Sequence, residues 1–236
     1  MTFDEIYVNS FNRLAVFLCQ RVAETPHKVN NPLTLYGASG AGKTMLLQAI
    51  ADTARSNNPE SRIVFVTAGA LLDELVEALQ DGGIEAMEQR YLQADYVLID
   101  MLELLHGKES STAYIMRLVD RLVAEGKQVV LAMSAVAEDA FRSKTLGGLR
   151  QKYKDGFLVD IQPPSEAERL EFTLLFVRQH KFPLSEAVCT LIAAHTESFR
   201  QIIGAVTTLS AHRELLSAAP PLATVIQALT NKKLCP

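Results

Sequence analysis

The feature that most constrains this chain is a glycine-rich octapeptide, residues 37–44, with the sequence GASGAGKT. It follows a short apolar run, residues 33–36, and opens into residues 45–54, which have the composition of a helix. The octapeptide matches the pattern G-x-x-x-x-G-K-[ST], and a strand before it with a helix after it is the context that supports phosphate binding. The sequence therefore predicts that the chain binds a nucleoside triphosphate or diphosphate.

Each residue type in this loop has a physical role in holding phosphates. Glycines let successive backbone N–H groups curl into an anion-binding concavity, and the N-terminus of the following helix adds the positive end of its dipole. Lys43 supplies a mobile positive charge for the β- and γ-phosphates, while Thr44 offers a hydroxyl to Mg²⁺. We expect ATP or ADP with Mg²⁺ to be held by Gly37, Ser39, Gly40, Ala41, Gly42, Lys43, Thr44 and Met45.

Apolar runs rich in β-branched residues alternate with helical patterns up to a proline pair, Pro163-Pro164. The expected strands are residues 33–36, 62–67, 96–99, 128–133 and 156–161. The expected helices before and between them include 10–24 (capped by Ser10), 45–54, 70–80 and 111–125. Such alternation predicts an α/β fold with a five-stranded parallel sheet between helices, and ligands bound at the carboxyl ends of the strands.

The sequence after the proline pair is helical throughout. The expected helices are 165–181, with Ser165 and Glu168 forming a capping box, then 184–195, 198–217 and about 222–230. We therefore expect two domains, an αβα nucleotide-binding core over residues 1–162 and a small all-helical lid over residues 163–236.

Composition excludes several classes of function. A net charge of −4 gives no general attraction for polyanionic nucleic acid. The three cysteines, Cys19, Cys189 and Cys235, lie far apart, and the first two sit in apolar helical patterns typical of buried thiols. No apolar run reaches the length of a membrane span and no signal peptide begins the sequence, so we expect a cytoplasmic protein without a membrane partner.

Asp100 ends the apolar strand pattern of residues 96–99, where a carboxylate can hold the hydration shell of Mg²⁺ beside Thr44. Hydrolysis by this geometry usually needs a second acidic residue to position the attacking water. The next residue is Met101, which cannot do so, and the nearest carboxylates are Glu103 and Glu109. Weak or absent hydrolysis and hydrolysis through one of these two glutamates are both open.

Three further polar features are candidates for the same site. Ser134 follows the fourth strand and could bond the γ-phosphate or the attacking water, and Arg200 begins a helix beyond the proline pair. A basic segment, residues 142–154, could reach a neighbouring subunit's nucleotide, contact DNA phosphates or remain solvated; it carries Arg142, Lys144, Arg150, Lys152 and Lys154. Residues 71–90, by contrast, are strongly acidic and would repel a nucleic-acid backbone.

The order of these motifs resembles the AAA+ module of the bacterial replication initiator DnaA. The resemblance covers residues 31–44 (NPLTLYGASGAGKT) and 91–100 (YLQADYVLID), and continues through 107–109, 149–156, Pro163-Pro164 with Glu168-Arg169, and 198–205. It implies an αβα core with a helical lid, adenine held near Tyr7 and Val8, and ATP-dependent assembly. It also makes Arg200 the sensor-two arginine, places Ser134 near the sensor-one position and puts Lys152 where initiators carry the arginine that touches the next subunit's γ-phosphate.

The departures from the DnaA pattern concern hydrolysis and DNA binding. DnaA has a second aspartate where Met101 stands. It also has an arginine where Lys152 stands, so the planar, two-pronged guanidinium is replaced by a compact ammonium. The segment with which DnaA grips single-stranded DNA maps to the acidic residues 71–90, and no duplex-binding domain is expected before the chain stops at Pro236. The chain also resembles the DnaA-related regulator Hda in its length, in the non-acidic residue after Asp100 and in the glutamate at position 103. Proteins of the Hda type usually begin with a clamp-binding peptide, and residues 1–10 contain none.

Three hypotheses follow. The first is a nucleotide-gated switch that regulates replication initiation through self-assembly or contacts with DnaA and other replication proteins, with slow or absent hydrolysis. The second is an active ATPase of initiator or helicase-loader type that binds single-stranded DNA, suggested by the basic segment 142–154 and Arg200. The candidate catalytic residues are Asp100, Glu103, Ser134 and Lys152. The third is the nucleotide module of a DnaA whose duplex-binding domain is missing. The first accounts best for the intact loop beside Met101.

Overall fold

The computed structural model describes residues 2–26, 31–134 and 157–213. The chain divides into two compact units, Met1–Ile161 and Gln162–Pro236, which are taken separately below. In the described part of the chain, no helix is both long enough and apolar enough to cross a membrane.

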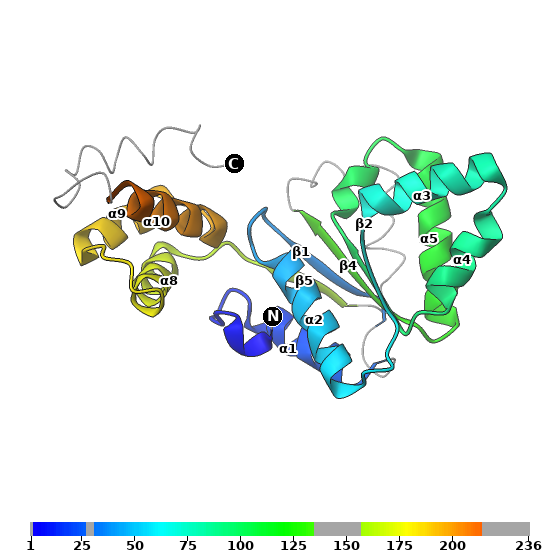
Figure 1. The fold of residues 1–236 in the computed structure, drawn as a ribbon, viewed down its shortest axis with the longest axis horizontal. Helices are drawn as coiled ribbons and strands as arrows, with labels where there is room; N and C mark the ends of the chain where they lie inside the picture. Colours follow the sequence, from blue (N-terminus) through cyan, green and yellow to red (C-terminus); the bar gives the residue numbers. More distant parts are fainter. Residues whose placement is uncertain (1, 27–30, 135–156, 214–236) are drawn as a thin grey trace. The chain divides into compact units, whose positions relative to one another are not determined.

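The first unit is built on a five-stranded sheet in the order β2-β3-β4-β1-β5, in which every pair is parallel (Figure 1). The strands are β1 (Leu33–Gly37), β2 (Ile63–Thr67), β3 (Tyr96–Asp100), β4 (Gln128–Ser134) and β5 (Phe157–Ile161). The prediction of a five-stranded parallel sheet is confirmed. The register pairs Gly37 with both Ser134 and Ile161, and Thr67 with Asp100, so these strands end at one edge.

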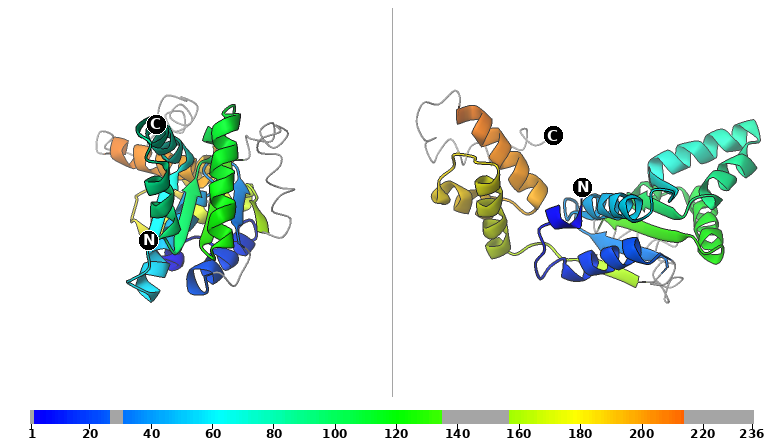
Figure 2. Two further views of the ribbon diagram at one scale, coloured as in Figure 1. Left: turned by 90° about the vertical axis from the view of Figure 1, so that its right-hand side faces the viewer. Right: turned by 60° about the horizontal axis from the view of Figure 1, so that its bottom comes forward.

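Helices cover both faces of this sheet (Figures 1 and 2). They are η1 (Phe3–Glu5), α1 (Arg13–Glu24), α2 (Lys43–Asn57), α3 (Ala68–Asp81), α4 (Ile84–Leu92), η2 (Leu102–Leu105) and α5 (Glu109–Ala124). One buried cluster joins α3, α4, η2 and α5 to alternate residues of β3 and β4, including Val97 and Ile99. Tyr96, on the other face of β3, instead donates its hydroxyl to the carbonyls of Val22 and Ala23 at the end of α1.

The first helix begins later than predicted. The expected helix over residues 10–24 with Ser10 as cap is wrong at its start, because α1 begins at Arg13 and its N-cap is Asn12. The Asn12 side chain is buried and turns back, accepting the Asn9 N–H at 2.9 Å and donating to the Tyr7 carbonyl at 2.8 Å. Residues 10–12 therefore form a turn that anchors the preceding segment to α1.

Asparagine also fixes the start of the sheet. Asn31, in a cis peptide bond with Pro32, donates to the Lys127 carbonyl at 2.6 Å and accepts the Val129 N–H at 2.9 Å. One side chain thus aligns the amino ends of β1 and β4, and the phosphate loop follows at the other end of β1.

The second unit contains α8 (Glu166–Gln179), α9 (Glu186–His195) and α10 (Phe199–Arg213) in its described part. Their buried side chains form a separate core that includes Val177, Ile192, Ile202 and Val206. The predicted capping box is present, with Ser165 and Glu168 bonded reciprocally at the start of α8. The expected helix at about residues 222–230 lies outside the described residues, as does Cys235, whereas Cys19 and Cys189 are both buried as predicted.

Candidate nucleotide-binding site

The site lies where β1, β3 and β4 end. Gly37, Asp100 and Ser134 are the last residues of these three neighbouring strands, and the parallel register brings them to the same edge of the sheet. Parallel α/β sheets bind ligands outside the carboxyl ends of their strands. The predicted phosphate-binding and strand-end residues of the core are therefore brought together.

The phosphate loop runs from β1 into α2, and two of its glycines have backbone angles that only glycine adopts freely. Gly40 has φ of 80° and Gly42, the N-cap of α2, has φ of 95°. A Cβ atom on Gly37 would stand 2.6 Å from the Ile161 carbonyl oxygen of β5. Gly40 and Gly42 thus let the chain turn into α2, and Gly37 lets β1 and β5 approach closely.

Lys43 is the first residue of α2 and is 7% exposed. Its ammonium donates to the carbonyls of Gly37 at 2.8 Å and Ala38 at 2.9 Å, inside the loop that precedes it. An ammonium held by two carbonyls of the phosphate loop lies where a bound phosphate is expected, and its long side chain lets it move onto phosphate oxygens.

Thr44 and Asp100 meet across the site. The Thr44 hydroxyl donates to Oδ2 of Asp100 at 2.6 Å, and Oδ1 of Asp100 accepts the Met101 N–H at 2.8 Å. Hydroxyl and carboxylate oxygens are the donors that Mg²⁺ prefers, and Mg²⁺ at such sites also uses phosphate oxygens and water. The Thr44–Asp100 pair therefore has the donor types that fit Mg²⁺ bound together with a phosphate ligand. Within the described residues, no group of three or more His, Cys, Asp or Glu side chains could hold a metal ion.

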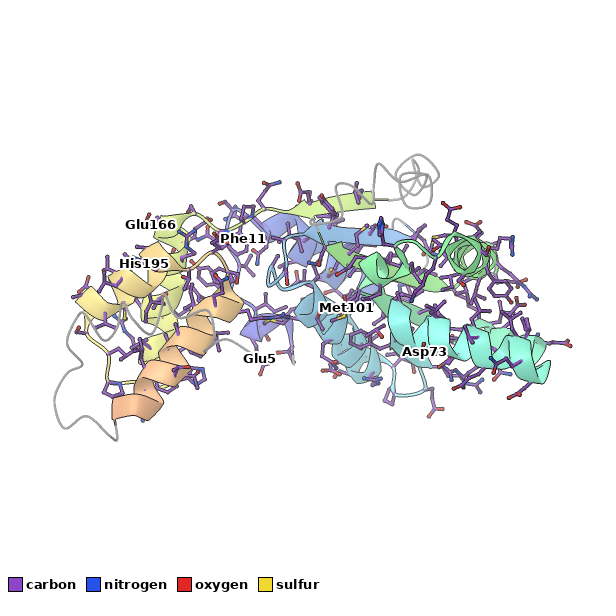
Figure 3. All side chains as sticks on the ribbon, turned by 90° about the horizontal axis from the view of Figure 1, so that it is seen from above. Glu5, Phe11, Asp73, Met101, Glu166 and His195 are labelled. Atoms are coloured by element: carbon purple, nitrogen blue, oxygen red, sulfur yellow. The ribbon has the colours of Figure 1, made fainter. Side chains whose placement is uncertain are left out.

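The residue after Asp100 has an unusual backbone conformation. Met101, labelled in Figure 3, is 40% exposed and has φ of 57° and ψ of 45°, in the left-handed region that side-chain-bearing residues rarely adopt. It turns the chain into η2, where Glu103 accepts the Ser134 N–H through Oε2 at 3.0 Å. The structure therefore brings Glu103 to the end of β4, beside the predicted Ser134.

Tyr7 and Val8, predicted to hold adenine, follow η1, and η1 contacts α2, the helix after the phosphate loop. Tyr7 stacks on Phe11 with ring centroids 6.4 Å apart, and Val8 is 43% exposed. Asn12 fixes this segment through its two bonds to Asn9 and Tyr7. The sequence analysis missed this positioning role; the signal available was a polar residue directly before the apolar pattern of α1.

For two predicted residues of the site, the structure does not test the prediction. Arg200 is exposed in the first turn of α10, in the second unit, and is described within that unit alone. Lys152 and the whole basic segment 142–154 lie outside the described residues. Glu109 begins α5, beyond Gly107, whereas Glu103 is bonded to the end of β4.

The outer surface of α3 and α4 is acidic. Asp73, labelled in Figure 3, is exposed together with Glu77 and Asp81, and the one cation among residues 71–90, Arg90, is bonded to Glu74 at 2.8 Å. Arg90 also stands over the ring of the buried Tyr91, whose hydroxyl donates to Glu74 at 2.7 Å. Burial and the Glu74 carboxylate together raise the pKa of Tyr91. This surface offers a phosphodiester backbone charge repulsion.

The comparison with known proteins agrees with this geometry. The sequence model of the bacterial DnaA ATPase domain matches residues 1–160. Domain III of the Thermotoga maritima replication initiation protein DnaA superposes with a TM-score of 0.85 at 26% identity, covering 100% of this chain and 97% of that one. AMPPCP-bound DnaA from Aquifex aeolicus gives a TM-score of 0.80 at 25% identity, over 92% of this chain and 67% of that one.

A further initiator structure, DnaA bound to AMPPCP and single-stranded DNA, matches with a TM-score of 0.79 at 25% identity, over 88% of this chain and 64% of that chain. This chain thus spans about two thirds of the length of that initiator. The DnaC helicase loader, at 14% identity and a TM-score of 0.55, shares the fold alone.

The sheet order, the phosphate loop at the end of β1 and the strand-end Asp100 define a P-loop NTPase of the AAA+ class. Within that class the match over residues 1–160 is specific. The chain belongs to the bacterial DnaA ATPase domain family.

Proposed function

We propose that this chain is a nucleotide-dependent switch in replication initiation, which binds ATP or ADP with Mg²⁺ and acts through contacts with itself or with other replication proteins. Hydrolysis by the isolated chain is slow or absent. The observation that carries the proposal is the contrast at the strand ends: a phosphate loop with its Thr44–Asp100 pair stands beside Met101, which has no group to activate water.

The roles of individual residues follow from this contrast. Residues 37–45 hold the phosphates, with Lys43 moving from the Gly37 and Ala38 carbonyls onto phosphate oxygens, and Thr44 and Asp100 hold Mg²⁺ and its water. Tyr7 and Val8 contact adenine, while Ser134 and Arg200 sense the terminal phosphate. Lys152 meets the nucleotide of a neighbouring subunit. Glu103 is the carboxylate best placed to orient water, but Oε2 accepts the Ser134 N–H.

The test is ATP turnover with Mg²⁺, measured beside nucleotide affinity for the wild type, Met101→Asp and Glu103→Gln. We expect the wild type to bind tightly and to turn over well below ~1 s⁻¹, the low end of ordinary enzymes. Met101→Asp should raise turnover without tightening binding, because it supplies a carboxylate next to Asp100. Wild-type turnover near that rate, lost in Glu103→Gln but not in Met101→Asp, would refute the slow-switch proposal and make the chain an active ATPase.

The alternative, an active initiator-type ATPase on single-stranded DNA, has one observation in its favour, since a related DnaA has been solved with single-stranded DNA. The acidic surface of α3 and α4 argues against the same binding mode here. Binding of a fluorescent oligonucleotide with and without ATP tests it. Binding that strengthens with ATP and weakens steeply as salt rises would support it, whereas no binding at low salt would exclude it.

A further inference from the structure

Arg169, in the first turns of α8, joins two segments of the second unit through its guanidinium. Its Nη1 donates to the Pro164 carbonyl at 2.7 Å and its Nε donates to the Ala193 carbonyl at 2.9 Å. Pro164 belongs to the linker that follows β5 in the sequence, and Ala193 lies in the last turn of α9. One side chain therefore ties the linker to the end of a helix that is distant in sequence.

The Ala193 carbonyl needs such a partner because α9 stops abruptly. The last carbonyls of a helix have no N–H in a following turn, and here Thr196 is already extended, with φ of −120° and ψ of 152°. The Thr196 hydroxyl bonds the Ile192 carbonyl at 2.7 Å, and the Glu197 N–H bonds the Gln201 side chain rather than Ala193. Arg169 reaches across from α8 to satisfy Ala193, and its charge suits the negative end of the α9 dipole.

The same side of α8 also holds the residue next to Arg200. Phe172 follows Arg169 by three positions, a spacing that puts both on one helix face. The Phe172 ring packs on Phe199 with centroids 4.3 Å apart, and Phe199 directly precedes Arg200 in the first turn of α10. One face of α8 thus holds both ends of the short α9–α10 connection: Arg169 bonds the end of α9, and Phe172 packs on the start of α10.

We propose that Arg169 is a positioning residue for Arg200: it locks the end of α9 to the Pro164 linker, and so fixes the turn from which Arg200 projects. This inference rests on the proposed role of Arg200 as a phosphate sensor.

A double-mutant cycle in the full chain tests the proposal. The variants are Arg169→Gln, Arg200→Ala and both together, with Arg178→Gln as matched control, since Arg178 is exposed on the same helix. The readouts are the dissociation constants for ATP and ADP and the midpoint of thermal unfolding. We expect Arg169→Gln to weaken ATP binding roughly tenfold in the wild-type background and hardly at all beside Arg200→Ala. The loss of thermal stability should be equal in both backgrounds, and Arg178→Gln should change neither quantity.

Each outcome distinguishes the two proposals. If Arg200→Ala weakens ATP binding but Arg169→Gln weakens it by the same factor in both backgrounds, or not at all, Arg169 only stabilises the unit and the inference is wrong. If Arg200→Ala leaves ATP affinity unchanged, the sensor role fails and the inference fails with it. Wild-type protein that binds no nucleotide overturns the proposed function itself.

Discussion

Two neighbouring segments at the edge of the sheet contrast in how regular they are. The phosphate loop, between β1 and α2, places glycines where positive φ or a close approach requires them and buries the Lys43 ammonium. In the segment from Asp100 to Leu105, by contrast, Met101 has φ of 57°, and Glu103 accepts the Ser134 N–H at the end of β4. The first segment contains the residues expected to hold phosphates, whereas in the second the residue directly after Asp100 is not acidic.

This difference separates binding from hydrolysis in physical terms. Phosphates are held by N–H groups, a helix dipole and one ammonium, all supplied by a single continuous stretch of chain. Water activation needs a carboxylate aimed from another strand, and there the Glu103 carboxylate accepts the Ser134 N–H, a bond within the protein itself. Nucleotide affinity and turnover should therefore respond to different substitutions.

The largest effect is expected from Lys43→Ala. Removing the ammonium takes away the charge-assisted bonds to phosphate, so ATP affinity should fall on the order of 100-fold. Isothermal titration calorimetry would measure it. Lys127→Ala is the control, because Lys127 precedes β4 at the opposite edge of the sheet, and its backbone bond to Asn31 survives the substitution. A smaller loss in Lys43→Ala than in the control would place the phosphates elsewhere.

Gly37→Ala should reduce stability, because its Cβ would stand 2.6 Å from a backbone oxygen of β5 that has little room to move. We expect the free energy of unfolding to fall by about 1–3 kcal/mol, measured by urea denaturation. Gly83, at the N-cap of α4, has open space around its Cβ position, so Gly83→Ala should cost less than about 1 kcal/mol. Equal losses in the two variants would contradict the close packing of the loop on β5.

Thr44→Val tests the metal half of the binding segment. Without the hydroxyl, Mg²⁺ loses a ligand and Oδ2 of the buried Asp100 loses its 2.6 Å bond. The gain in ATP affinity on adding Mg²⁺ to EDTA-treated protein should shrink about tenfold. Thr112→Val removes a buried hydroxyl bonded to the Leu105 and Lys108 carbonyls, and should lower stability without altering the Mg²⁺ response. A full Mg²⁺ response in Thr44→Val would mean that the ion binds without Thr44.

The sequence predicted the sheet and the phosphate loop because both follow from local patterns, apolar β-branched runs and a glycine-rich octapeptide before a helix. It could not predict the contacts made over long separations. The Glu103–Ser134, Asn31–Val129 and Arg169–Ala193 bonds join residues whose proximity depends on the finished fold. The start of α1 was misplaced for a different reason, because the apolar pattern does not show that Asn12 bonds the nearby backbone of Tyr7 and Asn9 and that the helix starts after it.

The smallest effect is expected at Met101, and it tests whether this segment is strained. Asparagine enters the left-handed region more readily than methionine, so Met101→Asn should raise the free energy of unfolding by about 1 kcal/mol. Lys181, with φ of 54° in the second unit, is the matched position, and Lys181→Asn should stabilise by a similar amount. Nucleotide affinity should stay constant in both variants, because neither side chain carries a phosphate contact in the proposed site. If Met101→Asn stabilised nothing while Lys181→Asn did, packing of the Met101 side chain would offset its backbone strain. The contacts of the Met101 side chain would then hold the residue in its left-handed conformation.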